Sequence, residues 1–113
     1  MIKASFKRDS EGDIVSVTLS GHAMNGEAGH DIVCAGVSAL TFNAVNSIEA
    51  LAGHQPIVDM ADEAEGGYLY FEIIAGLTEE KIQITRILME SLLIGLTEIE
   101  EEYSQYVQVK TTK

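Results

Sequence analysis

The sequence predicts an α+β fold in a single domain, residues 1–113, with the order β-β-α-β-β-α-β and a mixed sheet covered by two helices. Short segments alternate apolar and polar residues, which is typical of half-buried strands. Two longer segments repeat apolar residues at spacings of three and four, which is typical of helices that bury one face. With 113 residues, 46% of them hydrophobic, the chain can build one core and is not expected to be disordered.

The first two strands are predicted at residues 2–8 and 14–20. The first segment, IKASFKR, places Ile2, Ala4 and Phe6 on one face, and the second, IVSVTLS, alternates again and is rich in β-branched residues. The connecting residues 9–13 contain charged side chains and a glycine, which favour a turn. Together the two segments predict a β-hairpin.

The first helix is predicted at residues 31–53. Asp31 is the expected N-cap, because its carboxylate accepts hydrogen bonds from unpaired N–H groups of the first turn. Gly53 is the expected C-terminal stop, with Pro56 shortly after it. Gly36 lies inside this helix, where glycine costs roughly 1 kcal/mol relative to alanine. That cost indicates a requirement for close packing or for access to the helix.

The second half of the chain repeats these patterns. Strands are predicted at residues 56–62, 68–74 and 106–110, with a turn at residues 63–67. Thr78 is the expected N-cap of a long second helix, whose apolar stripe extends to Tyr103. This stripe is wider than one sheet face usually covers, so we expect part of it to meet a second subunit in a homodimer.

Charge and composition restrict the class of partner. Acidic residues outnumber basic ones by 18 to 7, and the formal net charge of −11 argues against direct contact with nucleic-acid phosphates. The charge suits a basic polypeptide partner, or it serves solubility alone. A single cysteine cannot form an internal disulfide, which fits a reducing compartment. The start of the chain lacks a signal-peptide pattern and the apolar stretches look shorter than a membrane span, so we expect a cytoplasmic protein without a membrane partner.

The glycine-rich segment 21–30 and the start of the first helix contain the candidate site. If Asp31 is the N-cap, Cys34 lies in the first turn, where the helix dipole and unpaired N–H groups favour the thiolate. His22, at the other end of the loop, could accept the thiol proton. Gly21, Gly26 and Gly29 could bring the backbone close to an extended peptide, or they could serve turns only.

The neighbouring residues leave alternatives open. Asp31 could orient the His22 imidazole as the third member of a triad, or it could act as a cap alone. Ser38, one turn after Cys34, could hold the substrate or face solvent. His22, His30, Asp31 and Cys34 do not show the paired spacing of the usual zinc sites, and no phosphate-binding loop is present. We therefore expect neither a metal nor a cofactor.

Residues 21–40 also resemble a known family. The elements GHA at 21–23, Gly29 and DIVCAGVSAL at 31–40 are similar to the signature of the ribosomal-processing cysteine protease family, often called Prp. Residues 89–103 resemble the C-terminal helix of that family. The resemblance implies that Cys34 is the nucleophile and His22 the base. It further implies a cysteine endopeptidase that removes the N-terminal extension of a large-subunit ribosomal protein and supports ribosome assembly.

An alternative from another functional class is a non-catalytic, acidic, dimeric module that binds a ribosomal protein. Such a module would have the same charge and the same apolar stripe, but it would need no reactive thiol. Rapid, pH-dependent alkylation of Cys34 would favour the enzyme, whereas a thiol inert until denaturation would favour the binding module.

Overall fold

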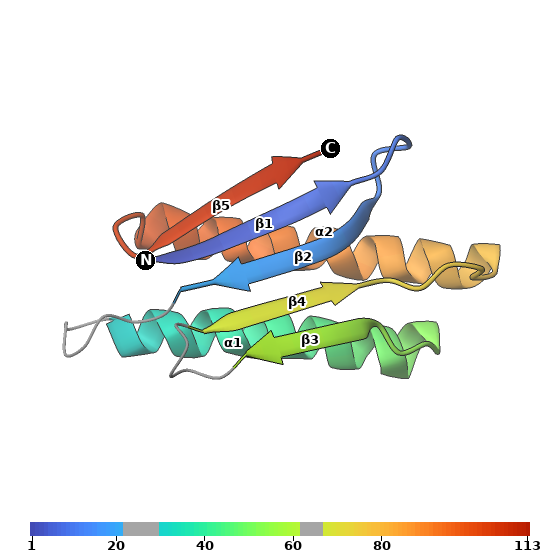
Figure 1. The fold of residues 1–113 in the computed structure, drawn as a ribbon, viewed down its shortest axis with the longest axis horizontal. Coiled ribbons are helices and arrows are strands. Elements are labelled where there is room, and N and C mark those ends of the chain that lie inside the picture. The colour runs from blue at the N-terminus through green and yellow to red at the C-terminus, as the bar shows by residue number, and fades with distance from the viewer. Residues whose placement is uncertain (22–29, 62–66) are drawn as a thin grey trace.

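The computed structural model describes residues 1–21, 30–61 and 67–113, with the backbone alone for residues 30 and 31. The elements follow the predicted order (Figure 1): β1 (Ile2–Arg8), β2 (Ile14–Ser20), α1 (His30–Ser47), a π-helical turn η1 (Ile48–Ala52), β3 (Ile57–Ala61), β4 (Tyr68–Glu72), α2 (Glu79–Glu102) and β5 (Val107–Thr112). Residues 63–66 of the expected turn and most of the glycine-rich loop lie outside the described residues.

The strands form one mixed sheet in the order β3-β4-β2-β1-β5. The β1–β2 hairpin is antiparallel, with Phe6 opposite Val17, and the β2–β4 and β3–β4 pairs are antiparallel as well. β5 instead lies parallel to β1, because α2 carries the chain back along the sheet between β4 and β5. The mixed sheet expected from the sequence is confirmed.

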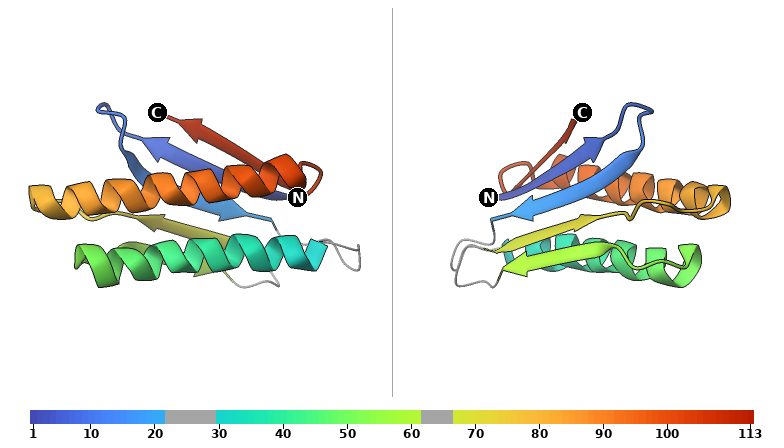
Figure 2. Two further views of the ribbon diagram at one scale, coloured as in Figure 1. Left: turned by 180° about the vertical axis from the view of Figure 1, so that it is seen from behind. Right: turned by 45° about the vertical axis from the view of Figure 1, so that its right-hand side comes forward.

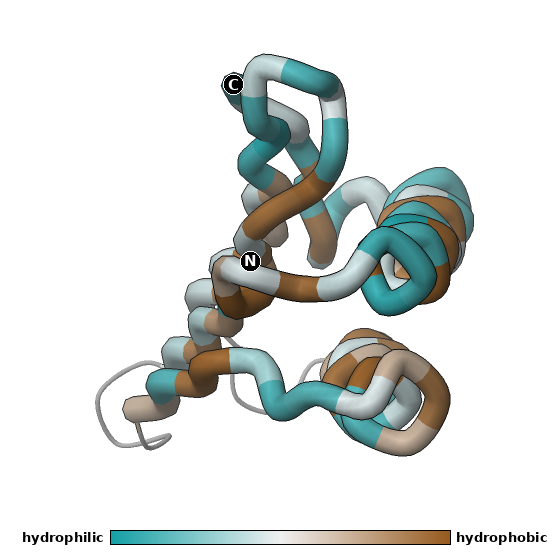
Figure 3. Tube along the Cα trace, turned by 90° about the vertical axis from the view of Figure 1, so that its right-hand side faces the viewer, coloured by the Kyte–Doolittle hydropathy of each residue, from teal (hydrophilic) through white to brown (hydrophobic). Residues whose placement is uncertain are grey.

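Both helices cover the same face of this sheet, as the end-on view in Figure 3 and the two views in Figure 2 show. The core lies between the two layers, where Phe6 and Phe71 from the strands are fully buried together with Ile48, Met89 and Leu96 from the helical layer. Alternate residues point to the opposite face, which no helix among the described residues covers. The period-two pattern in the sequence reflects this one-sided burial.

The first helix departs from the expected boundaries at its N-terminal end. α1 begins at His30, so Asp31 is its second residue and not the residue that precedes it. The apolar periodicity starts only after Asp31 and therefore cannot define the first turn. At the other end the helix continues through η1 to Gly53, which adopts a left-handed conformation with φ +73°. The predicted glycine stop is confirmed.

Glycines allow α1 and α2 to pack closely. A Cβ atom on Gly36 would lie 3.6 Å from Cδ1 of Ile99, and one on Gly95 would lie 2.9 Å from Cδ1 of Leu40. Gly36 therefore faces the second helix, but a methyl group there would make only an ordinary contact with Ile99, so the tighter approach between the helices is at Gly95.

The second helix begins as predicted. Thr78 is the N-cap, and its hydroxyl accepts a hydrogen bond from the Lys81 N–H at 3.3 Å. Two ion pairs then tie α2 to the hairpin: Arg8 to Glu90 at 2.6 Å and Arg86 to Asp13 at 2.8 Å. No local pattern predicts these contacts, since 73 or more residues separate the partners.

The expectation that no apolar stretch approaches a membrane span needs correction. Residues Ile32–Ala52 form 21 helical residues that are long and apolar enough to cross a membrane by length and composition. The core helix of a globular domain passes the same test, and here Val33, Val37, Ala44 and Ile48 of this segment are buried in the core. One face of the segment therefore packs in the core, whereas Ile32 and Leu51 of the segment are exposed.

Candidate active site

Cys34 is the fifth residue of α1 and lies in its second turn. This differs from the expected first-turn position, because the helix starts earlier than the apolar pattern indicates. The amide of a fifth residue is already part of the intrahelical hydrogen-bond ladder, and the dipole effect declines beyond the first turn. The helix start is therefore farther from Cys34 than the sequence suggested.

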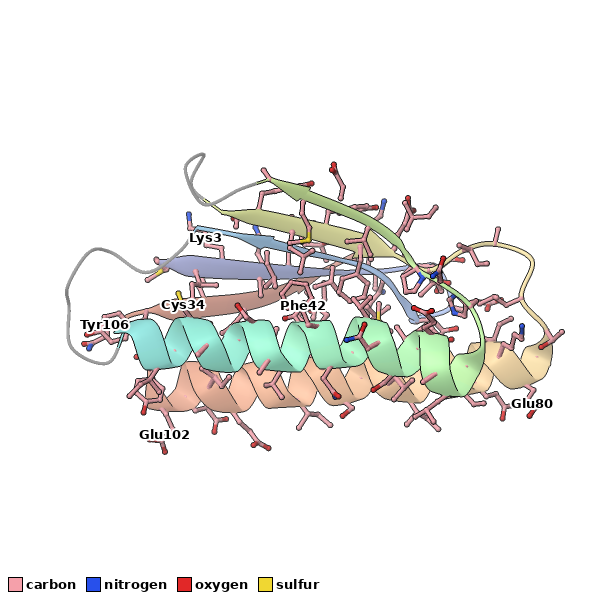
Figure 4. The ribbon with its side chains drawn as sticks, turned by 90° about the horizontal axis from the view of Figure 1, so that it is seen from below. Lys3, Cys34, Phe42, Glu80, Glu102 and Tyr106 are labelled. Atoms are coloured by element: carbon pink, nitrogen blue, oxygen red, sulfur yellow. The ribbon has the colours of Figure 1, made fainter. Side chains whose placement is uncertain are left out.

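The Cys34 side chain is partly buried and points from α1 toward the sheet (Figure 4). It lines a cavity of about 210 Å³ between α1 and the sheet. The walls are mainly apolar and come from both layers: Val37, Ser38 and Phe42 from α1, and Ile2, Leu19, Met60, Ala61, Gly67, Tyr68 and Leu69 from the strands and their ends, together with Gly21. The cavity offers an apolar environment beside a single thiol.

Helical spacing places three cavity residues in a row. Cys34, Ser38 and Phe42 are four residues apart and thus lie on one face of α1. Ser38 is exposed and lines the cavity, so it faces the same space as the thiol. Ser38 was predicted as a site residue from this spacing. Phe42 was not, although it lies one further turn along the same face of the helix.

Gly21 ends β2 at the edge of the cavity. Its φ is +81°, and a Cβ atom there would overlap the carbonyl oxygen of Met1. Its N–H donates to the Gly67 carbonyl at 3.2 Å. Gly21 is thus fixed by close backbone packing, which gives a physical reason for glycine at this position, and its predicted contact with a substrate peptide stays a prediction.

The remaining predicted site residues are not placed. His22, Gly26 and Gly29 lie outside the described residues, as does the side chain of Asp31. The described part of the chain therefore brings Gly21, Cys34 and Ser38 to one cavity.

His54 is a buried titratable side chain for which the sequence predicts no role. It is 7% exposed, and its Nε2 lies 3.1 Å from Oγ1 of Thr85. Its Nδ1 is buried and has no hydrogen-bond partner among the residues that the structure describes. Burial lowers the pKa of His54, and the nearby charge of Lys81 lowers it further. Because His54 follows the C-terminal end of the helical segment and does not line the cavity, it belongs to the core and not to the candidate site.

Comparison with known proteins matches the whole domain. A family model described as cysteine protease Prp matches residues 1–108. A ribosomal processing cysteine protease Prp of Bacillus subtilis is 40% identical over 111 residues, which cover 98% of this chain and 97% of the relative. The corresponding protein of Staphylococcus aureus is 34% identical over 109 residues, 96% of this chain and 97% of the relative.

Solved structures show the same architecture. The crystal structure of SMU.848 from Streptococcus mutans aligns with a TM-score of 0.87 at 39% identity, covering 100% of this chain and 96% of that one. A ribosomal processing protease Prp from S. aureus in complex with a substrate peptide aligns with a TM-score of 0.77 at 31% identity, over 98% of this chain and 99% of that one. The same S. aureus protease with a covalently linked product peptide gives 0.79 at 30% identity, with the same coverage.

Proposed function

The chain belongs to the Prp family of cysteine proteases, and from this premise we propose that it removes the N-terminal extension of a large-subunit ribosomal protein and so supports ribosome assembly. As a member of this family it is a cysteine peptidase. The observation that carries the proposal is the position of Cys34, the single cysteine, in an apolar cavity between α1 and the sheet. The relatives named for ribosomal processing supply the substrate class.

In the proposed reaction His22 and Cys34 form a catalytic dyad. His22 accepts the thiol proton, and the Cys34 sulfur forms a bond to the carbonyl carbon of the scissile peptide. The C–N bond then breaks, the imidazolium returns its proton to the leaving amine, and water hydrolyses the thioester. The support is that Gly21, which immediately precedes His22, lines the same cavity as Cys34. Asp31 is proposed to orient His22, and no metal or cofactor takes part.

The test is cleavage of a ribosomal-protein precursor that carries its extension, with the products weighed by mass spectrometry. We expect Cys34→Ala and His22→Ala each to abolish cleavage while the circular dichroism spectrum stays unchanged. His30→Ala is the matched control, because it removes a histidine near the start of α1 that has no role in the proposed mechanism. Near wild-type turnover by His22→Ala would contradict the dyad.

The alternative, a non-catalytic module that binds a ribosomal protein, is tested by the thiol itself. The proposed enzyme should react quickly with iodoacetamide in the folded state, and the rate should follow the titration of the dyad. The binding module predicts reaction only after denaturation. Cys34 is partly exposed in the cavity, which allows a small reagent to reach it.

We also propose that the protein acts in the cytoplasm, where ribosomal proteins are made, and that it is a homodimer. The support for a dimer is the outer surface of α2. Ile87 and Ile94 lie one heptad apart on this helix and are 69% and 60% exposed. Large apolar side chains this exposed and in line along a helix are typical of a surface that a partner covers.

A further inference from the structure

The strand β3 leaves apolar side chains uncovered on the side that faces the helices. Val58 pairs with Phe71, and Met60 pairs with Leu69, so each pair points to the same face of the sheet. Phe71 and Leu69 are buried, at 0% and 8% exposure, whereas Val58 and Met60 are 42% and 57% exposed. The helical layer therefore closes over β4 but does not close over β3.

The opposite wall of this uncovered space is α1. Phe42 is 41% exposed and lines the cavity together with Met60 and Ser38. Figure 4 shows Phe42 farther along α1 than Cys34, on the side of the helix that faces the sheet. Met60 and Phe42 thus line an apolar groove, here called the β3–α1 groove, which belongs to the cavity at Cys34, and Val58 lies beyond it on the same face of β3.

The outer backbone edge of β3 is also available. β3 is the terminal strand of the sheet and pairs with β4 on one side only. At the other end of the sheet, the Val109 N–H of the edge strand β5 donates to the Glu100 carboxylate at 2.7 Å. In the part of the chain that the structure describes, no comparable hydrogen bond reaches β3. Its unpaired N–H and C=O groups are the kind that pair with an added strand.

We propose that an extended apolar segment of the substrate binds as an added strand along β3 and places alternate side chains in the β3–α1 groove. This inference rests on the proposed function, because the groove is continuous with the cavity that holds Cys34. A peptide in extended form suits the site, since the five residues of β3 span about 17 Å and side chains of a strand alternate between its two faces.

Binding is measured by fluorescence anisotropy with the Cys34→Ala variant, so that cleavage does not interfere. The probe is a fluorescein-labelled peptide that contains the extension and the first residues of the mature ribosomal protein. We expect Phe42→Ser and Met60→Ser each to raise Kd roughly tenfold to a hundredfold, the range for loss of one buried apolar side chain. Leu51→Ser is the control, because Leu51 is 63% exposed and lies outside the cavity lining, and it should leave Kd unchanged.

A second probe tests pairing with the backbone. Peptides with N-methyl groups at successive positions should alternate between weak and unchanged binding, because only every second N–H of an added strand points toward β3. Three results would overturn the proposal: the groove and control variants have equal Kd values, the peptide does not bind, or Kd is independent of N-methylation. Loss of a dimer in Met60→Ser without a change in Kd would assign the edge to a second copy and would also overturn it.

The cleavage assay separates this inference from the proposed function. If the wild-type protein cleaves the precursor and the groove variants bind the peptide normally, the groove assignment fails and the function stands. If the peptide binds in the groove with the expected pattern but the wild-type protein does not cleave the precursor, the function fails and the groove assignment stands.

Discussion

Two glycines with left-handed backbones, Gly21 and Gly12, differ in their surroundings. Their φ values are +81° and +88°, but a Cβ atom on Gly21 would overlap the Met1 carbonyl, whereas the space around Gly12 is empty to 4 Å. We expect Gly12→Ala to cost roughly 1–3 kcal/mol of unfolding free energy, the cost of a left-handed alanine. Gly21→Ala should cost more, because the backbone beside the cavity must also move. Urea denaturation of both variants measures the difference, and equal losses would contradict it.

Replacing Gly36 with alanine should have the opposite effect on the unfolding free energy. Its added Cβ would make an ordinary contact with Ile99 at 3.6 Å, and its φ is not in the left-handed region. Gly36→Ala should therefore raise the unfolding free energy by about 0.5–1 kcal/mol, because alanine restricts the unfolded chain and favours the helix. A loss of stability in urea denaturation would show that the helices cannot accept even this methyl group.

His54 predicts a dependence of stability on pH. Burial, and then the charge of Lys81, lowers the pKa of His54 below its ordinary value of 6.5, so the folded protein favours the neutral imidazole. The unfolded chain then binds more protons as pH falls below about 6.5, and the unfolding free energy must decrease. We expect His54→Gln, which can keep a hydrogen bond to Thr85, to lose this decrease. Urea midpoints at several pH values test the prediction; parallel profiles for the two proteins would refute it.

At the level of elements, the strands and helix ends that depend on local pattern were predicted well. The bounds of β1 and β2 follow from strict alternation between turn residues, and the ends at Thr78 and Gly53 follow from cap chemistry. The start of α1 was misplaced, because Asp31 is a good cap residue and nothing in the apolar pattern distinguishes a cap from a second helical residue.

Contacts between distant elements were beyond the sequence alone. Nothing local in β5 specifies a parallel place beside β1, and nothing in β3 specifies an edge position. The same limit applies to the site. Cys34 and Ser38 could be chosen by residue type and helical spacing, but Met60 and Leu69 enter the cavity only through the pairing of β3 with β4. Whether these two side chains line the cavity depends on tertiary packing, and no residue pattern within either strand predicts it.

At the scale of the whole molecule, charge opposes the association of two copies. Each chain carries a formal charge of −11, so a dimer must gain enough from apolar contact to exceed this repulsion. Ile87 and Ile94 on the outer surface of α2 are the side chains we expect to supply that contact. Added salt screens the repulsion, with a Debye length of about 10 Å at 0.1 M, and leaves apolar burial largely intact.

The dimer should therefore tighten as salt rises, which distinguishes an apolar interface from one built on ion pairs. We expect sedimentation equilibrium to give twice the chain mass of 12.2 kDa and a Kd that falls between low and moderate NaCl. Ile87→Glu and Ile94→Glu should each shift the protein toward the monomer, because each buries a charge at the interface and adds to the repulsion. Leu51→Glu adds the same charge on another exposed apolar residue and should leave the mass unchanged. A wild-type protein that sediments as a monomer when dilute, or a dimer that weakens with salt, would rule out association through this surface of α2.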